Sequence, residues 1–445
     1  MRIPLPLLTP LLSGCCWLTT HTTPEGIARW QSTSPPTATL AAKADRYQRD
    51  LEARFQTPAG LVDYRRVAFR SSAVSRWGSA PTAASIPVST SPARLCVMRP
   101  RGVRRRGPRS CELLDGLDLL HDVTGKRGLL ARAARHRLPD RPSERPDVEI
   151  LPSSSRPGWT YRGDVSKDQY AGAVLGLGVT LALVEDPEVR RRVAALAAAL
   201  ADQLIDGDMR IVDTDGNVTT HGDLRARVWG LPIGVNALIS LAIGRVAMTA
   251  TGEDRHRRLW ERLVEEGYPD AAYWAHFELF GVGHRVNDHM GYLSIYLLFL
   301  LTPTPSAREA LRDSERRSWS HVGADRNAFF ALVHATFVEE SGESAATQAV
   351  EALREFPERK IPLPVDLTRP GFNFPRTFLN SRKCLPRTTE GLPLHLRPVS
   401  SSYWAADPFA LVGRLTANGS SEYAGMDYLL AYWMARFHGY VNPDD

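Results

Sequence analysis

The sequence predicts an all-α protein built from paired antiparallel helices, with one small β-hairpin. Apolar residues recur at helical spacing through most of residues 112–437, which is the pattern of helices that bury one face. Short connections join these segments, so neighbouring helices are expected to be antiparallel. The clearest strand pattern is at 209–220, where Asp215-Gly216 is typical of a type I′ hairpin turn. Together these observations favour helical hairpins over a sheet-based fold.

The stretch 163–177, GDVSKDQYAGAVLGL, joins polar side chains to the start of an apolar helix. Ser166 and Gln169 have the spacing of a capping box, in which each side chain bonds the other's backbone N–H, so a helix is expected over 167–184. Glycines in this helix lower its intrinsic stability, which suggests that another element approaches closely. The polar residues indicate either the rim of a site or a well-capped core helix with solvated charges: Asp164, Lys167, Asp168 and Tyr170.

The remaining helices follow in quick succession. Asp186-Pro187 predicts an N-cap and a first-turn proline for a helix that forms an antiparallel hairpin with the one before it. Asp325 and Ser344 are expected to cap two later helices. Further helices are expected over residues 227–249, 254–266, 271–280, 289–301, 306–317, 326–340, 345–356 and 426–438.

The N-terminus has the features of an export signal. A short basic start and an apolar segment at 3–12 precede Leu-Ser-Gly-Cys, which has the spacing of a lipobox ending at Cys15. This arrangement resembles bacterial lipoprotein signals, which implies a lipid anchor on Cys15 and a domain in the cell envelope, outside the cytoplasm. Residues 1–15 are therefore predicted to be a signal peptide and 16–40, rich in Thr, Ser and Pro, a tether from the membrane. The folded domain is expected over 41–445.

Residues 66–111 differ in composition from both flanks. They are rich in Ser, Pro and Arg and have neither helical nor strand periodicity. We interpret them either as a disordered basic loop or as the product of a shifted reading frame in the source gene. Six arginines within 99–109 equal the net charge of +6, so the rest of the chain is near neutral and no nucleic-acid partner is expected. Beyond Cys15 and Cys16, the cysteines lack the spacing of a disulfide framework or a zinc site.

About a dozen helices paired by short loops, with little strand, suggest hairpins arranged in a ring. This pattern resembles the α/α-toroid of six-hairpin glycosidases and their lyase and epimerase relatives, over residues 112–437. The segments GDVSKDQYAG, NDHMGY and DYLLAYW are also similar to segments of uncharacterised bacterial lipoproteins of this build. The resemblance implies inner helices whose N-terminal loops surround one funnel, where a carbohydrate would bind.

Three polar clusters precede helices that would line such a funnel, and they supply the candidate site residues. Glycoside hydrolysis uses two carboxyl groups, one of which stays protonated, and Asp168 and Asp288 are the candidate pair. His284 or His289 could move protons or orient a carboxylate. The candidate substrate-binding residues, which include aromatic rings on which sugars could stack, are Asp164, Tyr170, Tyr292, Tyr403, Trp404 and Asp407.

Each candidate has a structural alternative. Asp288 and Asp407 could be N-caps of the segments that follow them, and His284 could be a hydrogen-bonding loop residue. Tyr403 and Trp404 could pack in the core, where large aromatic side chains are common.

The sequence also excludes several activities. No nucleotide-binding loop, nucleophile elbow, S-x-x-K or H-E-x-x-H motif occurs at the required spacing, and no metal or cofactor is predicted. The prediction is an envelope lipoprotein whose helical domain binds a carbohydrate and could hydrolyse it as a glycoside hydrolase. The competing hypothesis is a non-catalytic binding or scaffolding protein of the envelope. Geometry separates the two, because carboxylates at 168 and 288 more than roughly 12 Å apart could not act on one glycosidic bond.

Overall fold

A computed structural model describes most of the chain after residue 35. The described residues are 36–63, 65–66, 112–136, 150–276, 278–279, 282–283, 285–302, 305–339, 343–362, 391–411, 419 and 421–445. The predicted signal peptide, most of the predicted tether and nearly all of 66–111 lie outside these residues.

The described part is mostly helical, as the sequence predicts, and contains twelve α-helices. A π-helical turn, Leu51–Phe55, continues the first of them. The helices are α3 (Leu40–Asp50), α5 (Glu112–Asp122), α6 (Lys167–Leu183), α7 (Pro187–Asp206), α8 (Gly234–Thr251), α9 (Asp254–Glu265), α10 (Tyr268–Ala272), α11 (Arg285–Leu301), α12 (Pro305–Val322), α13 (Ala328–Phe337), α14 (Glu343–Glu355) and α15 (Met426–Phe437).

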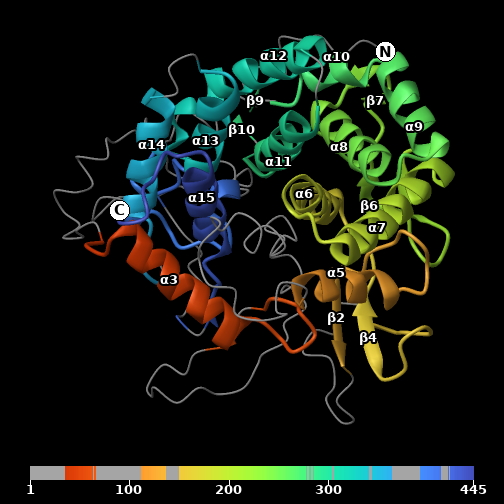
Figure 1. Ribbon diagram of the computed structural model, residues 1–445, viewed down its shortest axis with the longest axis horizontal. Coiled ribbons are helices and arrows are strands. Elements are labelled where there is room, and N and C mark those ends of the chain that lie inside the picture. The colour runs from red at the N-terminus through yellow and green to blue at the C-terminus, as the bar shows by residue number, and fades with distance from the viewer. Residues whose placement is uncertain are drawn as a thin grey trace, which may run out of the picture.

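Five helices form the interior. The residues of α6, α8, α11, α13 and α15 are buried on nearly all sides, which is why these segments are apolar throughout. The helices α3, α7, α9, α12 and α14 instead bury one face. Figure 1 shows the first group towards the middle of the molecule and the second group, with α5, around it.

Contacts between the interior helices show that α6, α8 and α11 run in the same direction. At their starts, Lys167 of α6 donates to Asn236 of α8 at 2.7 Å. Near their ends, Arg245 of α8 donates to the carbonyl of Leu301, the last residue of α11, at 2.9 Å. Between these points, a side chain at Gly178 of α6 would meet Leu297 of α11.

The helices α13 and α15 have this direction too. His289 near the start of α11 contacts Phe329 at the start of α13, with ring centroids 5.9 Å apart. Trp404 joins the starts of α13 and α15, because its carbonyl accepts from Asn327 at 3.0 Å and its indole N–H donates to the carbonyl of Asp427 at 2.8 Å. All five interior helices therefore begin at one end of the molecule. We call this end the rim and define it by their first residues: Lys167, Gly234, Arg285, Ala328 and Met426.

The N-terminal helix α3 packs antiparallel against the C-terminal helix α15. The carbonyl of Leu40 accepts from Tyr428 at 2.8 Å, and Arg54, beyond the end of α3, pairs with Glu422 before the start of α15. Lys43 is buried and donates to the carbonyls of Leu353, Arg354 and Phe356 at 3.1, 3.0 and 2.6 Å. These carbonyls lie at the C-terminal end of α14, where a cation is favourable. The two ends of the described chain are thus held together.

The strands form five small antiparallel sheets in the described part, not the single hairpin that the sequence predicts. The predicted hairpin is present as β5 (Arg210–Val212) and β6 (Val218–Asp223). The other sheets are β1 (Arg65–Arg66) with β11 (Ser421–Glu422); β2 (Ala133–His136), β4 (Trp159–Arg162) and β3 (Leu151–Pro152) in that order; β7 (Arg227–Val228) with β8 (Leu231–Pro232); and β9 (Glu278–Leu279) with β10 (Val282–Gly283).

Five local predictions are wrong. Ser344 lies inside α14 and is not its cap. The helix expected over 271–280 is the short α10, which ends at Ala272, and β9 follows. The turn between β5 and β6 is not type I′, because Gly216 has a positive φ of 86° and Asp215 does not. The helix expected from 227 begins at Gly234, since 227–232 form the β7–β8 hairpin. The N-cap of α13 is Asn327, which accepts from the backbone N–H of Phe330 at 3.2 Å.

One helix in the described part, α8, is long and apolar enough to cross a membrane, and 72% of it is buried inside the protein.

Candidate functional site

Asp288 is the centre of a buried polar cluster at the rim. It lies in the first turn of α11, with its side chain 2% exposed, and is not an N-cap. Its Oδ1 is 2.8 Å from Nδ1 of His276, and its Oδ2 accepts from Arg285 at 3.1 Å. Arg285 also donates to Asp325 at 3.0 Å. One guanidinium therefore contacts two buried carboxylates, so within this trio two acidic groups share a single positive charge.

Asp325, which the sequence suggested only as a helix cap, is the second carboxylate of this cluster. Burial raises the pKa of its carboxyl to about 7, although Arg285 and Arg397 act in the opposite direction. Arg397 is itself buried and donates to the carbonyl of Leu392 at 2.6 Å and to that of Asp325. Burial lowers the pKa of Arg397 to about 10. A carboxyl with a pKa near 7 exchanges its proton close to neutral pH.

Asp168, the other candidate acid, is half-buried in the first turn of α6. It accepts from the hydroxyl of Ser166. Its neighbour Lys167 donates to Asn236, and burial lowers the pKa of Lys167. The hydrogen-bond partners of Asp168 and Asp288 that the structure describes do not overlap, so each acid belongs to its own cluster.

Asp164 holds the β5–β6 hairpin against the start of α6. Its backbone N–H donates to Asp213 at 2.6 Å, and its Oδ1 accepts from the N–H of Thr220 at 2.7 Å. Its φ of 52° is in the left-handed region, which aspartate tolerates better than most residues. Arg132 donates to its carbonyl at 3.0 Å. These contacts show that Asp164 connects the β5–β6 hairpin to the start of α6.

The aromatic candidates lie in the core. Tyr170 is fully buried and its hydroxyl contacts the carbonyl of Gly128 at 2.7 Å and Gln203 at 2.5 Å. Tyr292 is buried and donates to Glu315 at 3.1 Å. Tyr403 and Trp404 are also buried. These rings have no exposed face on which a sugar could stack.

The remaining candidates have varied positions. His289 is buried against aromatic rings of α13. Asp407 is exposed and accepts from the N–H of Phe409 at 3.0 Å, as a turn residue does. His284 and the predicted lipidation residue Cys15 lie outside the described residues.

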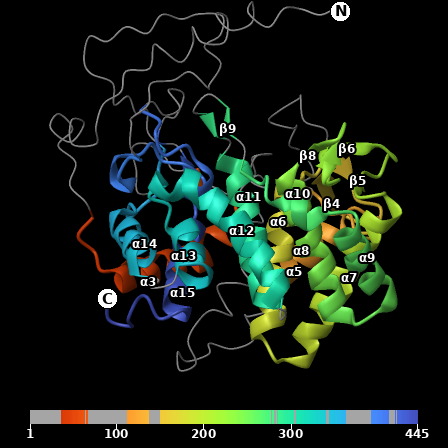
Figure 2. The same cartoon turned by 90° about the horizontal axis from the view of Figure 1, so that it is seen from above.

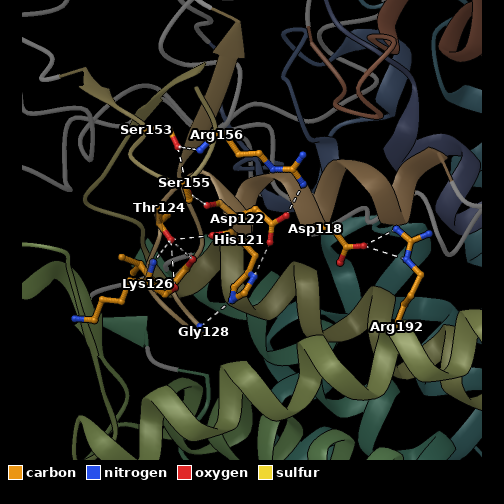
Figure 3. A network of polar contacts seen from close by, with 11 residues as sticks. Asp118, His121, Asp122, Thr124, Lys126, Gly128, Ser153, Ser155, Arg156 and Arg192 are labelled. Carbon is orange, nitrogen blue, oxygen red and sulfur yellow. Dashed lines mark hydrogen bonds and ion pairs between the residues drawn. The ribbon is translucent and has the colours of Figure 1, made fainter. Parts of the chain in front are cut away.

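A further polar network joins the end of α5 to the loop between β3 and β4, and Figure 3 shows it from close by. His121 accepts from the N–H of Gly128 at 2.9 Å and its other ring nitrogen is 3.3 Å from Asp122. Asp122 also pairs with Arg156. Because both nitrogens of His121 are engaged in local contacts, the network explains how a helix end is held and leaves no free base.

The exposed aromatic side chains near the rim were not among the candidates. Trp229, at the tip of the β7–β8 hairpin, is 97% exposed and Leu231 is 65% exposed. Tyr273 and Trp274, between α10 and α11, are 42% and 50% exposed. The sequence signal for the exposed Trp229 is the glycine after it, because Gly is favoured at the second position of a type I′ turn. In the structure both Trp229 and Gly230 have positive φ.

Both aromatic segments lie next to the start of α8. The hairpin leads directly into this helix, and an atom added at Gly234 would meet the backbone of Trp274 and Ala275 at 2.3 and 2.2 Å. Figure 2 shows β6, β8 and β9 on the side of the helical body where α11 begins. The rim therefore carries exposed rings above buried charged clusters.

No group of three or more His, Cys, Asp and Glu residues that could hold a metal ion occurs among the described residues. The chain matched no protein-family model, and a search of curated proteins also found no match.

Proposed function

We propose that this chain is a bacterial cell-envelope lipoprotein whose helical body is an α/α-toroid and binds a carbohydrate at the rim. The observation that carries the proposal is the exposed pair Trp229 and Trp274 beside the start of α8. Indole rings offer flat apolar faces with a polar edge, which suits the mixed surface of a sugar. Large aromatic side chains exposed near one another favour a binding role, because their apolar surface is unfavourable in water and a ligand would cover it.

Two features of the helices support the toroid. The interior helices run in one direction, and each is followed or preceded by a helix with one buried face. The outer partner of α15 is α3, which comes from the other end of the chain. A closed ring of hairpins requires such a contact between its first and last elements.

Binding has more support than hydrolysis. Asp288 is buried and both of its oxygens are occupied by His276 and Arg285, so a substrate would have to displace an ion pair to reach it. Hydrolysis is the second candidate, and the observation that favours it is Asp325, whose pKa of about 7 suits a general acid. Asp168 would then be the half-exposed partner.

The test uses the full chain on a glycan array, followed by analysis of products. Trp229→Ala and Trp274→Ala are each expected to weaken binding about tenfold, which is ~1.4 kcal/mol. Phe437→Ala, which removes an aromatic ring 43% exposed at the end of α15, is the control and leaves binding unchanged. Binding without cleavage favours the binding protein. Cleavage that is lost in Asp168→Asn and Asp325→Asn favours the hydrolase. If no carbohydrate binds, the proposal fails.

The lipid anchor has a separate test. Cells that express the wild type are expected to incorporate labelled fatty acid into the protein and retain it in the membrane fraction, because acyl chains supply stable anchoring. Cys15→Ala should lose both, whereas Cys384→Ala should lose neither. A wild-type chain without label would contradict the anchor.

A further inference from the structure

Each exposed tryptophan at the rim is accompanied by an arginine. Arg227 lies two residues before Trp229 and is exposed. The guanidinium of Arg317, on α12, lies over the rings of Trp274 and Tyr273, at 4.5 and 5.0 Å from their centroids. Arg317 also donates to the backbone carbonyls of Tyr273 and His276, at 3.3 and 3.2 Å, so it is held in place beside the rings.

These two arginines lack acidic partners among the described residues, unlike their neighbours in the chain. Arg225 pairs with Asp223 at 2.6 Å. Arg316 pairs with Glu309 and Asp313, each at 2.9 Å. Arg227 has no such pair in the described part of the chain, and Arg317 contacts only carbonyls and rings there. Their positive charges are therefore available to a ligand.

The two arginines approach the rim from different elements. Arg227 begins β7, which leads through the hairpin to Gly234, and the backbone of Trp274 packs against Gly234. Arg317 is attached to that same backbone segment through its two carbonyl contacts. A ligand that spans the start of α8 would meet ring faces and guanidinium groups together.

We infer that the rim binds an acidic carbohydrate, one whose sugar units carry carboxylate or sulfate groups. This inference rests on the proposed carbohydrate binding and specifies its ligand class. A guanidinium is planar and forms paired hydrogen bonds with carboxylate and sulfate oxygens. The ring of Trp229 and the part of Trp274 that Arg317 leaves exposed contact the sugar rings. The charge comes from the rim itself, because the chain outside 99–109 is near neutral.

The experiment compares two forms of one polymer, one with free carboxylates and one in which the same groups are neutral methyl esters. Polygalacturonate and its methyl ester are titrated into the full chain by calorimetry at low and high ionic strength. The wild type is expected to bind the acid roughly tenfold more tightly than the ester at low ionic strength, and the difference should shrink as salt screens the charges.

Arg227→Gln is the main variant, because its side chain is exposed and the substitution leaves the fold intact. It should weaken binding of the acid roughly two- to fivefold, the range of an exposed ion pair, and leave binding of the ester unchanged. Arg258→Gln, at an exposed position on α9, is the matched control and should change neither. Arg317→Lys keeps the positive charge but loses the planar guanidinium, and it should weaken binding of the acid but not of the ester.

The outcomes separate this inference from the proposed function. Equal affinity for acid and ester overturns the acidic ligand and leaves carbohydrate binding in place. If Arg227→Gln and Arg258→Gln reduce the preference for the acid equally, the preference comes from the overall charge of the protein and not from the rim. That outcome also overturns the inference. If neither polymer binds and the glycan array is empty, both proposals fail.

Discussion

Lys360 and Asp427 form an ion pair inside the core, and removing one partner tests how the rim end of α15 is held. Lys360 Nζ is 2.8 and 2.7 Å from the two carboxylate oxygens of Asp427 and 2.8 Å from the carbonyl of Ser401. The two side chains are 0% and 2% exposed. Lys360→Met preserves the apolar stem, but it leaves the Asp427 carboxylate buried without its counter-ion.

The expected loss follows from the remaining contacts. Removing one partner of a buried pair costs about 3–5 kcal/mol. Asp427 would keep the N–H donors of Tyr403 at 2.9 Å and Tyr428 at 3.2 Å, so we expect the lower end, about 3 kcal/mol. Adding Asp427→Asn removes the stranded charge, and the double variant should lose only about 1 kcal/mol relative to the wild type.

The assay is urea unfolding followed by circular dichroism, with the two single variants and the double variant as a thermodynamic cycle. Arg46→Met is the control, because it breaks a half-exposed pair with Glu358 and should lose less than about 1 kcal/mol. The reasoning is refuted if Lys360→Met loses no more than the control, or if the two single losses simply add in the double variant.

Three further predictions concern stability. Burial raises the pKa of Asp325 in the folded state from 3.8 to about 7. Between these two pH values the folded state binds a proton that the unfolded state has lost, so the free energy of unfolding falls as pH rises, by on the order of 4 kcal/mol. Asp325→Asn should flatten this fall in urea titrations at several pH values, and parallel profiles for variant and wild type would contradict it. Gly234→Ala should lower the free energy of unfolding by about 1–3 kcal/mol, because the added carbon meets the backbone of Ala275. Gly244→Ala on the same helix is the control and should lose less, because its added carbon meets a leucine side chain at 3.1 Å. Equal shifts in melting temperature for the two variants would contradict this reasoning. Asp186→Ala should lose about 1 kcal/mol in the same assay by removing an N-cap, and an unchanged midpoint would argue against that role.

Helix positions were predictable where the controlling residues are neighbours in the chain. Asp186 accepts from the N–H groups of Glu188 and Val189 at 3.0 and 3.1 Å, as its sequence predicts. The start of α6 is also as predicted, with Gln169 accepting from the N–H of Ser166 at 3.0 Å. These contacts span three residues at most, so local preferences decide them.

Predictions failed where a distant contact overrode a local preference. Asp325 has the character of a cap, but Arg285, forty residues earlier in the chain, draws its carboxylate into a buried ion pair. Arg326 then takes a positive φ of 51°, and Asn327 caps α13 instead. The type I′ turn was assigned to Asp215-Gly216, whereas Trp229-Gly230 in the β7–β8 hairpin has positive φ at both residues.

The sequence by itself determined the helical class, most helix starts and the placement of Asp168 in a first turn, because each depends on periodicity or capping within a few residues. Only the tertiary structure decided that Asp288 is buried with His276 and Arg285, that Tyr170 is a core residue, and that Trp229 is exposed at the rim. Burial and ion pairing depend on which surfaces meet, and those surfaces come from segments far apart in the chain.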